Sequence, residues 1–177
     1  MSGMHAYLSM RERASLCWRR RLEALQTLIG SIEKRIKIQH RSNEASKRLE
    51  TIPGIGVIGA TAIVATVSDP TAFRSGRDFA AWIGLVPRED STGGKKKLGP
   101  ISKQGDRYLR RILVVGAHSV LQRAKQNPVK YPWLTQLLAR RPFKVVAIAL
   151  ANKMARVAWA LLAHGGTYRA PALAATA

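Results

Sequence analysis

The stretch that decides how this chain is organised is WIGLVPREDSTGGKKKLGPISKQGDRYLRR, which runs from Trp82 to Arg111. A loop with two adjacent glycines and three consecutive lysines fills its middle, and a helix rich in arginine is expected from about residue 106 onward. Glycine lets a backbone bend sharply and approach a ligand closely, and the first N–H groups of a helix attract anions. We therefore interpret the stretch as an anion-binding loop. The alternative is a solvated basic loop between two helices.

The residues of this stretch expected to contact an anionic ligand share a hydroxyl group, a positive charge or the lack of a side chain. They are Thr92, Gly93, Gly94, Lys95, Lys96, Lys97, Ser102, Lys103, Arg107, Arg110 and Arg111. A small hairpin between Val86 and Leu98 is the one β-structure that the sequence allows, because strand-like alternation is absent elsewhere.

A second informative stretch lies upstream, LETIPGIGVIGATAIVATV, residues 49–67. Pro53 prevents the preceding helix from continuing, and Gly54 and Gly56 predict a tight turn in which Ile55 anchors the hairpin in the core. The turn resembles the helix-hairpin-helix of DNA-binding proteins, in which backbone N–H groups hold a phosphate without reading sequence. We predict that both glycines contact a nucleic-acid backbone, of DNA or of RNA. A plain helical hairpin is the alternative.

The rest of the chain predicts a mainly α fold. Ser75 is expected to cap a short helix whose apolar face includes Phe79 and Trp82, and Trp82 is expected in the core rather than as a base-stacking platform. Further helices are expected over residues 106–125, 133–139 and 143–164, the first ended by Asn127-Pro128 and the last by two glycines. The predicted architecture is a long N-terminal helix, a helix-hairpin-helix, and a helical domain with a basic glycine-rich loop or small hairpin.

The N-terminal segment from about Ser9 to Leu49 contains no proline and predicts one long helix after a frayed start. Its apolar residues recur at alternating steps of three and four, at Leu22, Leu25, Ile29, Ile32 and Ile36. This a/d pattern is typical of a coiled coil. We predict a stalk that joins subunits into a homo-oligomer, and the alternative is an amphipathic helix packed on its own domain.

Composition favours a polyanionic partner. The 177 residues carry 30 Lys and Arg against 10 Asp and Glu, a formal charge of +20. Nucleic acid is the first candidate and an anionic membrane the second. Polar and charged residues interrupt the most apolar segment, residues 145–163, which we expect to be a buried helix and not a membrane span. The single cysteine, Cys17, favours a reducing, cytoplasmic location.

A metal-dependent nuclease is disfavoured by the residues around the basic loop. Glu89, Asp90 and Asp106 are its only neighbouring acids, whereas such a site needs several converging carboxylates. If phosphodiester chemistry occurs here, a hydroxyl nucleophile is the more plausible route. We expect no metal or cofactor to be bound by this chain itself.

Three motifs then occur in the order of one known family: IPGIGVIGATAIVA, FAAWIGLVPRE, and STGGKKKLGPISKQGDRYLRRIL followed by a helix of small residues. Over residues 48–165 the chain resembles the 110/116/902 family of insertion-sequence transposases, which pair an N-terminal RuvC-like domain with a C-terminal serine domain. The resemblance implies a DNA recombinase guided by an RNA of the element. Its serine would attack a phosphodiester and become linked to DNA during transposition.

The resemblance places that serine at Ser91, and Ser102 is the weaker candidate because we interpret it as the cap of the following helix. The RuvC-like domain, whose four acidic residues bind Mg²⁺ in the family, has no counterpart here, so a truncated copy or one half of a split enzyme is expected. The expected divisions are a helical spacer over residues 1–48, the transposase domain over 49–165 and a flexible tail over 166–177. A non-catalytic basic module that binds DNA or RNA is the alternative function.

Overall fold

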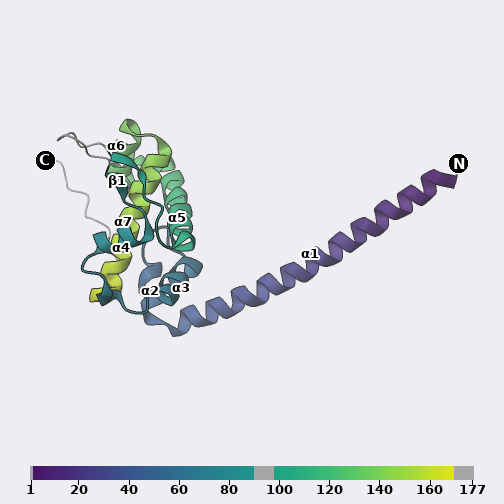
Figure 1. The fold of residues 1–177 in the computed structure, drawn as a ribbon, viewed down its shortest axis with the longest axis horizontal. Helices are drawn as coiled ribbons and strands as arrows, with labels where there is room; N and C mark the ends of the chain where they lie inside the picture. The colour runs from purple at the N-terminus through teal and green to yellow at the C-terminus, as the bar shows by residue number, and fades with distance from the viewer. Residues whose placement is uncertain (1, 90–97, 170–177) are drawn as a thin grey trace. The chain divides into compact units, whose positions relative to one another are not determined.

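The computed structural model describes residues 2–89 and 98–169, and in them the chain is mainly α, as predicted. The described residues form two compact units, one up to Gln39 and one from His40 onward (Figure 1).

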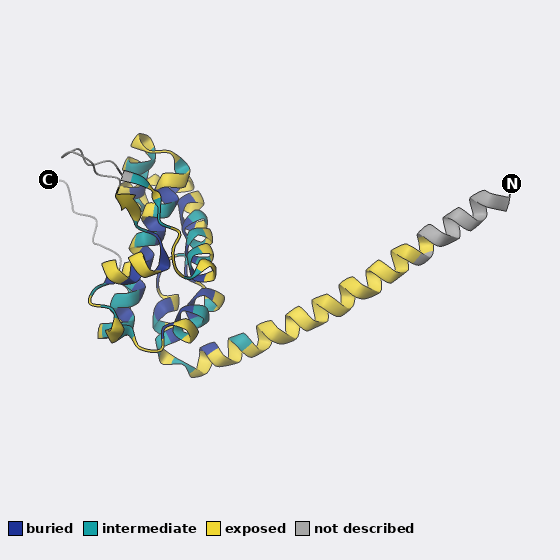
Figure 2. Cartoon of the chain, in the orientation of Figure 1, coloured by how far each residue is buried: buried dark blue, intermediate teal, exposed yellow. Residues whose placement is uncertain are grey.

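The first unit is the greater part of helix α1 (Ser2–Ser42). The helix begins further toward the N-terminus than the expected start at Ser9, and Gly30 does not interrupt it. Much of the predicted apolar seam lies exposed on it (Figure 2): Leu22, Leu25 and Ile29 each expose more than half of their surface. The seam is therefore present as a face of the helix, and its role in assembly stays a prediction.

The prediction of a single long helix up to Leu49 is wrong, because the helix is interrupted at Asn43. Asn43 adopts an extended backbone, and its side chain accepts a hydrogen bond of 2.9 Å from the N–H of Ser46. This is an N-cap, which favours the start of a new helix over continuation of the old one. Helix α2 (Glu44–Glu50) consequently begins one residue later.

Helices α2 and α3 (Val57–Thr66) form the predicted helical hairpin. Leu49, Ile52 and Ile55 are buried beneath it, which confirms the expected anchoring role of Ile55. Helix α2 also contacts α7, and α3 contacts α5, so the hairpin is packed against the rest of its unit.

The middle of the chain holds the 3₁₀ turn η1 (Pro70–Ala72), helix α4 (Gly76–Ile83) and the strands β1 (Pro87–Glu89) and β2 (Leu98–Ile101). Ser75 caps α4 as predicted, accepting a hydrogen bond of 3.2 Å from the N–H of Asp78. The strands pair antiparallel, Pro87 opposite Ile101, with an irregularity before Glu89 pairs with Leu98. The hairpin predicted around residues 86–98 is thus present.

The remaining elements are α5 (Arg107–Gln126), the 3₁₀ turn η2 (Pro128–Lys130), α6 (Pro132–Arg140) and α7 (Phe143–His164). In the described part of the chain, α7 is the one helix long and apolar enough to cross a membrane. Its buried residues nevertheless face α4 and α5 in the core, as expected for a buried helix: Val146, Ala147, Leu150, Ala151, Met154, Ala155, Ala158 and Leu161.

The chain still contacts this core beyond α7. The ring of Tyr168 packs against the core cluster, and its N–H donates a 3.0 Å hydrogen bond to the hydroxyl of Thr51. The part of the expected tail that the structure describes therefore does have a packing partner, since it returns over the end of α2.

Candidate nucleic-acid interface

The predicted basic loop is the connection between β1 and β2. Ser91, Thr92, Gly93, Gly94 and the lysines at 95–97 lie outside the described residues. The strands on either side of them are described, and they fix where the loop leaves and re-enters the domain. Two further hydrogen bonds extend this base: the N–H of Ser102 donates to Val86 O at 2.9 Å, and that of Lys103 to Gly84 O at 3.2 Å.

The base of the hairpin is interlocked with the end of α4 through two glycines. Gly84 (φ +82°) and Gly105 (φ +85°) both adopt the left-handed region that favours glycine. A Cβ atom on Gly84 would collide with the backbone of Gln104, and one on Gly105 with the carbonyl oxygen of Trp82. The segment after β2 therefore lies directly against the last turn of α4.

The three predicted phosphate-binding arginines of α5 have different surroundings. The guanidinium of Arg110 donates to Ile83 O at 2.7 Å and to Gln104 O at 3.3 Å, and it fastens α4 to the segment before α5. Arg107 and Arg111 are exposed, and neither forms an ion pair with a described residue. They stand four residues apart, so they share one face of the helix. Arg110 is therefore a structural cation, while Arg107 and Arg111 are available to a ligand.

Two more exposed cations lie at the base of the loop. The guanidinium of Arg88 on β1 donates to the carbonyl oxygen of Ser102 at 3.2 Å. Lys103 has a positive φ of 55°, an uncommon conformation for a residue with a side chain. Sequence reasoning missed Arg88, although its place at the start of the loop was a usable signal.

The expected role of Ser102 as a helix cap is wrong. Helix α5 begins at Arg107, and its N-cap is Asp106, whose carboxylate accepts a 2.7 Å hydrogen bond from the N–H of Leu109. Ser102 instead follows β2, and its backbone N–H is hydrogen-bonded to Val86, the residue before β1. Several residues separate Ser102 from the start of α5, because the chain first crosses the end of α4.

The two hairpin glycines also differ. Gly54 has a positive φ of 92°, and a Cβ there would lie 2.8 Å from Gly116 O and 2.9 Å from the Val120 side chain of α5. Gly56 is exposed, with nothing within 4 Å of such an atom, and it is the N-cap of α3 without a side-chain hydrogen bond. Gly54 thus lets the turn pack closely on α5, and Gly56 leaves the first N–H groups of α3 open to an anion.

The structure also joins a histidine, a serine and a glutamate that sequence reasoning did not connect. His40 Nδ1 lies 2.7 Å from Ser46 Oγ, and its Nε2 lies 2.9 Å from a carboxylate oxygen of Glu50. Ser46 is fully buried, so its hydroxyl is inaccessible to a phosphodiester. The hydrogen bonds of His40 instead connect the last turn of α1 to α2. These three residues are six and four positions apart and lie on both sides of the break between α1 and α2, so they form no periodic pattern that could be recognised in the sequence.

The described residues contain no group of three or more His, Cys, Asp or Glu side chains that could hold a metal ion. These described residues therefore do not form the Mg²⁺ site that the resemblance implies.

The described domain is helical and carries exposed cations at the base of the basic loop, and comparison with known proteins shows what it is similar to. Residues 46–132 match the family model "Transposase IS116/IS110/IS902 family". The chain is 48% identical over 149 residues to the "Probable family 20 transposase" of Pseudomonas aeruginosa, covering 84% of this chain and 44% of that protein. It is 44% identical over 141 residues to the transposase of insertion sequence IS1328 of Yersinia enterocolitica, covering 79% of this chain and 42% of that protein.

A third relative is the transposase of insertion sequence IS1111A of Coxiella burnetii, 41% identical over 142 residues, covering 80% of this chain and 39% of that protein. Over residues 46–132 the chain is therefore similar to the IS116/IS110/IS902 family of transposases. It spans about two fifths of the length of the relatives that it matches.

Proposed function

We propose that this chain is the DNA-joining part of a transposase, in which the hydroxyl of Ser91 attacks a DNA phosphodiester. The observation that carries the proposal is the family match across residues 46–132, which includes the whole loop and the hairpin that holds it. The exposed cations at the base of that hairpin, Arg88, Lys103, Arg107 and Arg111, support it, because they would offset the negative charge of the scissile phosphate.

In this proposal one Oγ–P bond forms at Ser91 and one P–O bond to a sugar breaks. The hydroxyl proton passes to a base, and the departing sugar oxygen takes up a proton to leave as a hydroxyl group. A serine hydroxyl is a weak nucleophile at neutral pH and needs such a base. Glu89, at the end of β1, is the described carboxylate nearest to Ser91 in sequence and is the candidate base. A partner domain is the expected source of the remaining proton transfer, to the departing sugar oxygen.

Four partners belong to the same proposal. DNA is bound by the loop and by the open N-terminus of α3 in the helix-hairpin-helix manner. A guide RNA of the element and a RuvC-like acidic domain complete the enzyme. A second copy of the chain pairs with α1 along the exposed apolar seam, because burial of such a seam is what drives coiled-coil assembly.

The test is formation of a covalent protein–DNA adduct. The chain is mixed with a separately made RuvC-like domain, the element's RNA and end-labelled DNA, and adducts are separated under denaturing conditions. Ser91→Ala should abolish the adduct and leave DNA binding almost unchanged, since one neutral hydroxyl contributes little beside the cations. Ser102→Ala is the matched control and should retain the adduct. Loss of the adduct in Ser102→Ala alone would show that the nucleophile was assigned to the wrong serine.

A further inference from the structure

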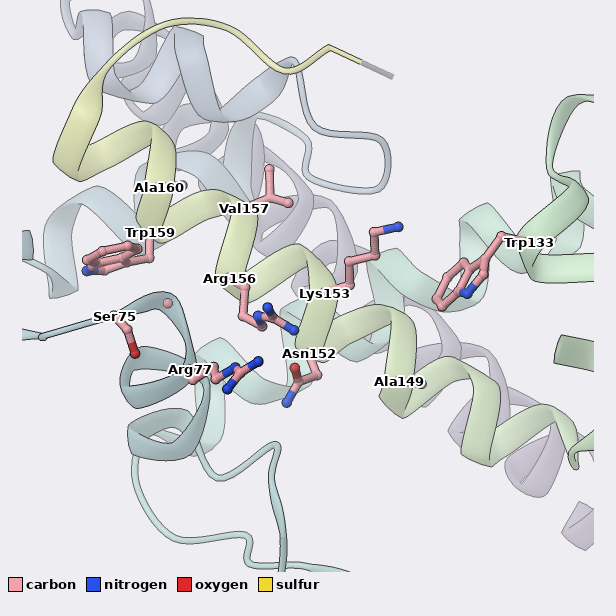
Figure 3. Close-up of a pocket in the computed structure, with 11 residues that line it drawn as sticks. Ser75, Arg77, Trp133, Ala149, Asn152, Lys153, Arg156, Val157, Trp159 and Ala160 are labelled. Carbon is pink, nitrogen blue, oxygen red and sulfur yellow. The ribbon is translucent and has the colours of Figure 1, made fainter. Parts of the chain in front are cut away.

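A groove of about 730 Å³ lies among α4, α6 and α7, and no described residue of the β1–β2 hairpin lines it (Figure 3). Its volume is in the range of ligand-binding pockets. Three cations line it, Arg77, Lys153 and Arg156, together with Trp133 and Trp159. None of the described residues that line it is acidic, so no carboxylate of the lining neutralises the three cations.

The cationic end of the groove is built by a close approach of two helices. A Cβ on Gly76, the first residue of α4, would lie 2.9 Å from the carbonyl oxygen of Arg156 and 3.1 Å from its Cα. This contact places the first turn of α4, with Arg77, directly beside α7. The side chains of Arg77 and Arg156 point toward one another and toward Asn152 (Figure 3). Neither arginine forms an ion pair with a residue that the structure describes.

Asn152 is held in place beside them. Its side-chain nitrogen donates a 3.3 Å hydrogen bond to the carbonyl oxygen of Leu85. Two guanidinium groups that converge without an acidic partner repel each other, and a phosphate between them would remove that repulsion. Arginine forks match the geometry of phosphate oxygens, so such a pair suits a phosphate group.

The other end of the groove offers an aromatic surface. Trp133 is 43% exposed, and the Nζ atom of Lys153 lies 4.4 Å from the centre of its ring. Trp159, by contrast, is fixed as a wall, because its indole N–H donates to Pro70 O at 3.0 Å and its ring meets His164 edge-on. Trp133 is therefore the less constrained of the two rings, and a base that stacks on the ring face covered by Lys153 must displace its ammonium group.

We propose that this groove binds an unpaired DNA strand, with a phosphate between Arg77 and Arg156 and a base stacked on Trp133. A cationic groove with an aromatic platform is the arrangement by which proteins hold single strands, because every base has a stacking face. Duplex DNA does not fit this arrangement, since its bases stack on one another. The choice of DNA over RNA rests on the proposed function. The groove would hold a strand displaced at the site of the break.

The experiment measures affinity of the full chain by fluorescence anisotropy, for an oligothymidylate of about 12 nucleotides and for a duplex of the same length. Trp133→Ala should weaken single-strand binding roughly 5- to 150-fold, the effect of losing one stacked base. Arg77→Ala/Arg156→Ala should weaken it at least about tenfold and reduce the dependence of log K on log salt by about 0.7 for the lost phosphate. Duplex binding should change by less than about twofold in the tryptophan variant, which has no stacking role there.

The matched control is Arg140→Ala/Arg141→Ala, which removes the same charge from exposed positions that do not line the groove. Trp133→Phe should keep most of the affinity, because phenylalanine also stacks, and should lose the quenching of Trp133 fluorescence that a stacked base is expected to cause in the wild-type chain. Equal losses in the control and in Arg77→Ala/Arg156→Ala would overturn the site. Tighter binding of oligouridylate than of oligothymidylate would overturn the assignment to DNA. If polyglutamate competed for the groove as well as oligothymidylate does, the groove would be a general anion site and the proposal of a single-strand site would be wrong.

This test is independent of the Ser91 adduct. An adduct that forms normally while the groove variants keep full single-strand affinity would refute the groove alone. Loss of single-strand binding in the groove variants, with no Ser91-dependent adduct from the wild-type chain, would refute the proposed chemistry alone.

Discussion

Replacement of the two hairpin glycines by alanine separates a packing role from a ligand-binding role. At Gly54 an alanine must adopt a φ near +92°, which costs about 1–2 kcal/mol for a residue with a Cβ. Its methyl group would also lie 2.8 Å from Gly116 O and 2.9 Å from Val120, and overpacking of this kind costs about 1–3 kcal/mol. We therefore expect Gly54→Ala to lower the free energy of unfolding by about 2–5 kcal/mol.

Gly56→Ala is the matched control from the same turn. Its backbone is extended (φ −95°, ψ −176°), which any residue adopts, and no atom lies within 4 Å of the added methyl group. The expected change in the free energy of unfolding is below about 1 kcal/mol, the scale of an altered N-cap. Since domains of this size are stable by about 5–15 kcal/mol, the difference between the variants is large enough to measure.

The assay is urea denaturation followed by tryptophan fluorescence, because Trp82, Trp133 and Trp159 all lie in the unit that begins at His40. A Gly54→Ala midpoint equal to that of Gly56→Ala would refute the close packing of the turn on α5. Duplex affinity is measured in parallel. Gly56→Ala should weaken DNA binding, since its methyl group stands where a phosphate would approach the N–H groups of α3. Unchanged affinity in a folded Gly56→Ala variant would refute the helix-hairpin-helix contact.

Three further outcomes are expected. Asp106→Ala should lower the free energy of unfolding by about 1 kcal/mol through loss of the α5 cap, while Ser102→Ala should leave it nearly unchanged; the reverse order in urea denaturation would contradict the observed cap. Ile29→Asp should shift the chain from oligomer to monomer in sedimentation velocity, and a wild-type chain already monomeric at micromolar concentration would exclude assembly through α1. Replacing all three lysines at 95–97 with alanine should reduce the salt dependence of duplex binding, because phosphate contacts release counterions; an unchanged slope would place the loop outside the DNA-binding face.

Local signals in the sequence were sufficient for most element boundaries. The start of α4 at its Ser75 cap, the end of α5 at Asn127-Pro128 and the start of α7 after Pro142 were all readable, because each depends on hydrogen-bonding or dihedral restrictions within a few residues. The hairpin around the basic loop was predicted for the same reason. These features need no knowledge of what packs against them.

Boundaries that depend on a choice between two local signals were less predictable. Ser102 and Asp106 are both good caps, and only the contact between Gly105 and α4 delays the helix to Arg107. Asn43 likewise lies inside an otherwise continuous helical pattern. Its cap prevails because the new helix α2 can then pack on α3 and α7, and this gain is absent from any window of local sequence.

Contacts between residues far apart in sequence decide which cations are used by the fold and which are exposed to a ligand. A net charge of +20 predicts a polyanionic partner without saying which cations meet it. Arg110 bonds to carbonyl oxygens of α4 and the preceding loop and is occupied by the fold, whereas Arg107, one turn before Arg111, is exposed. Arg77 and Arg156 are far apart in sequence and converge only because Gly76 brings α4 against α7. Sequence reasoning could therefore locate the basic loop, where the charges are consecutive, but could not find a second cationic site whose members meet only after folding.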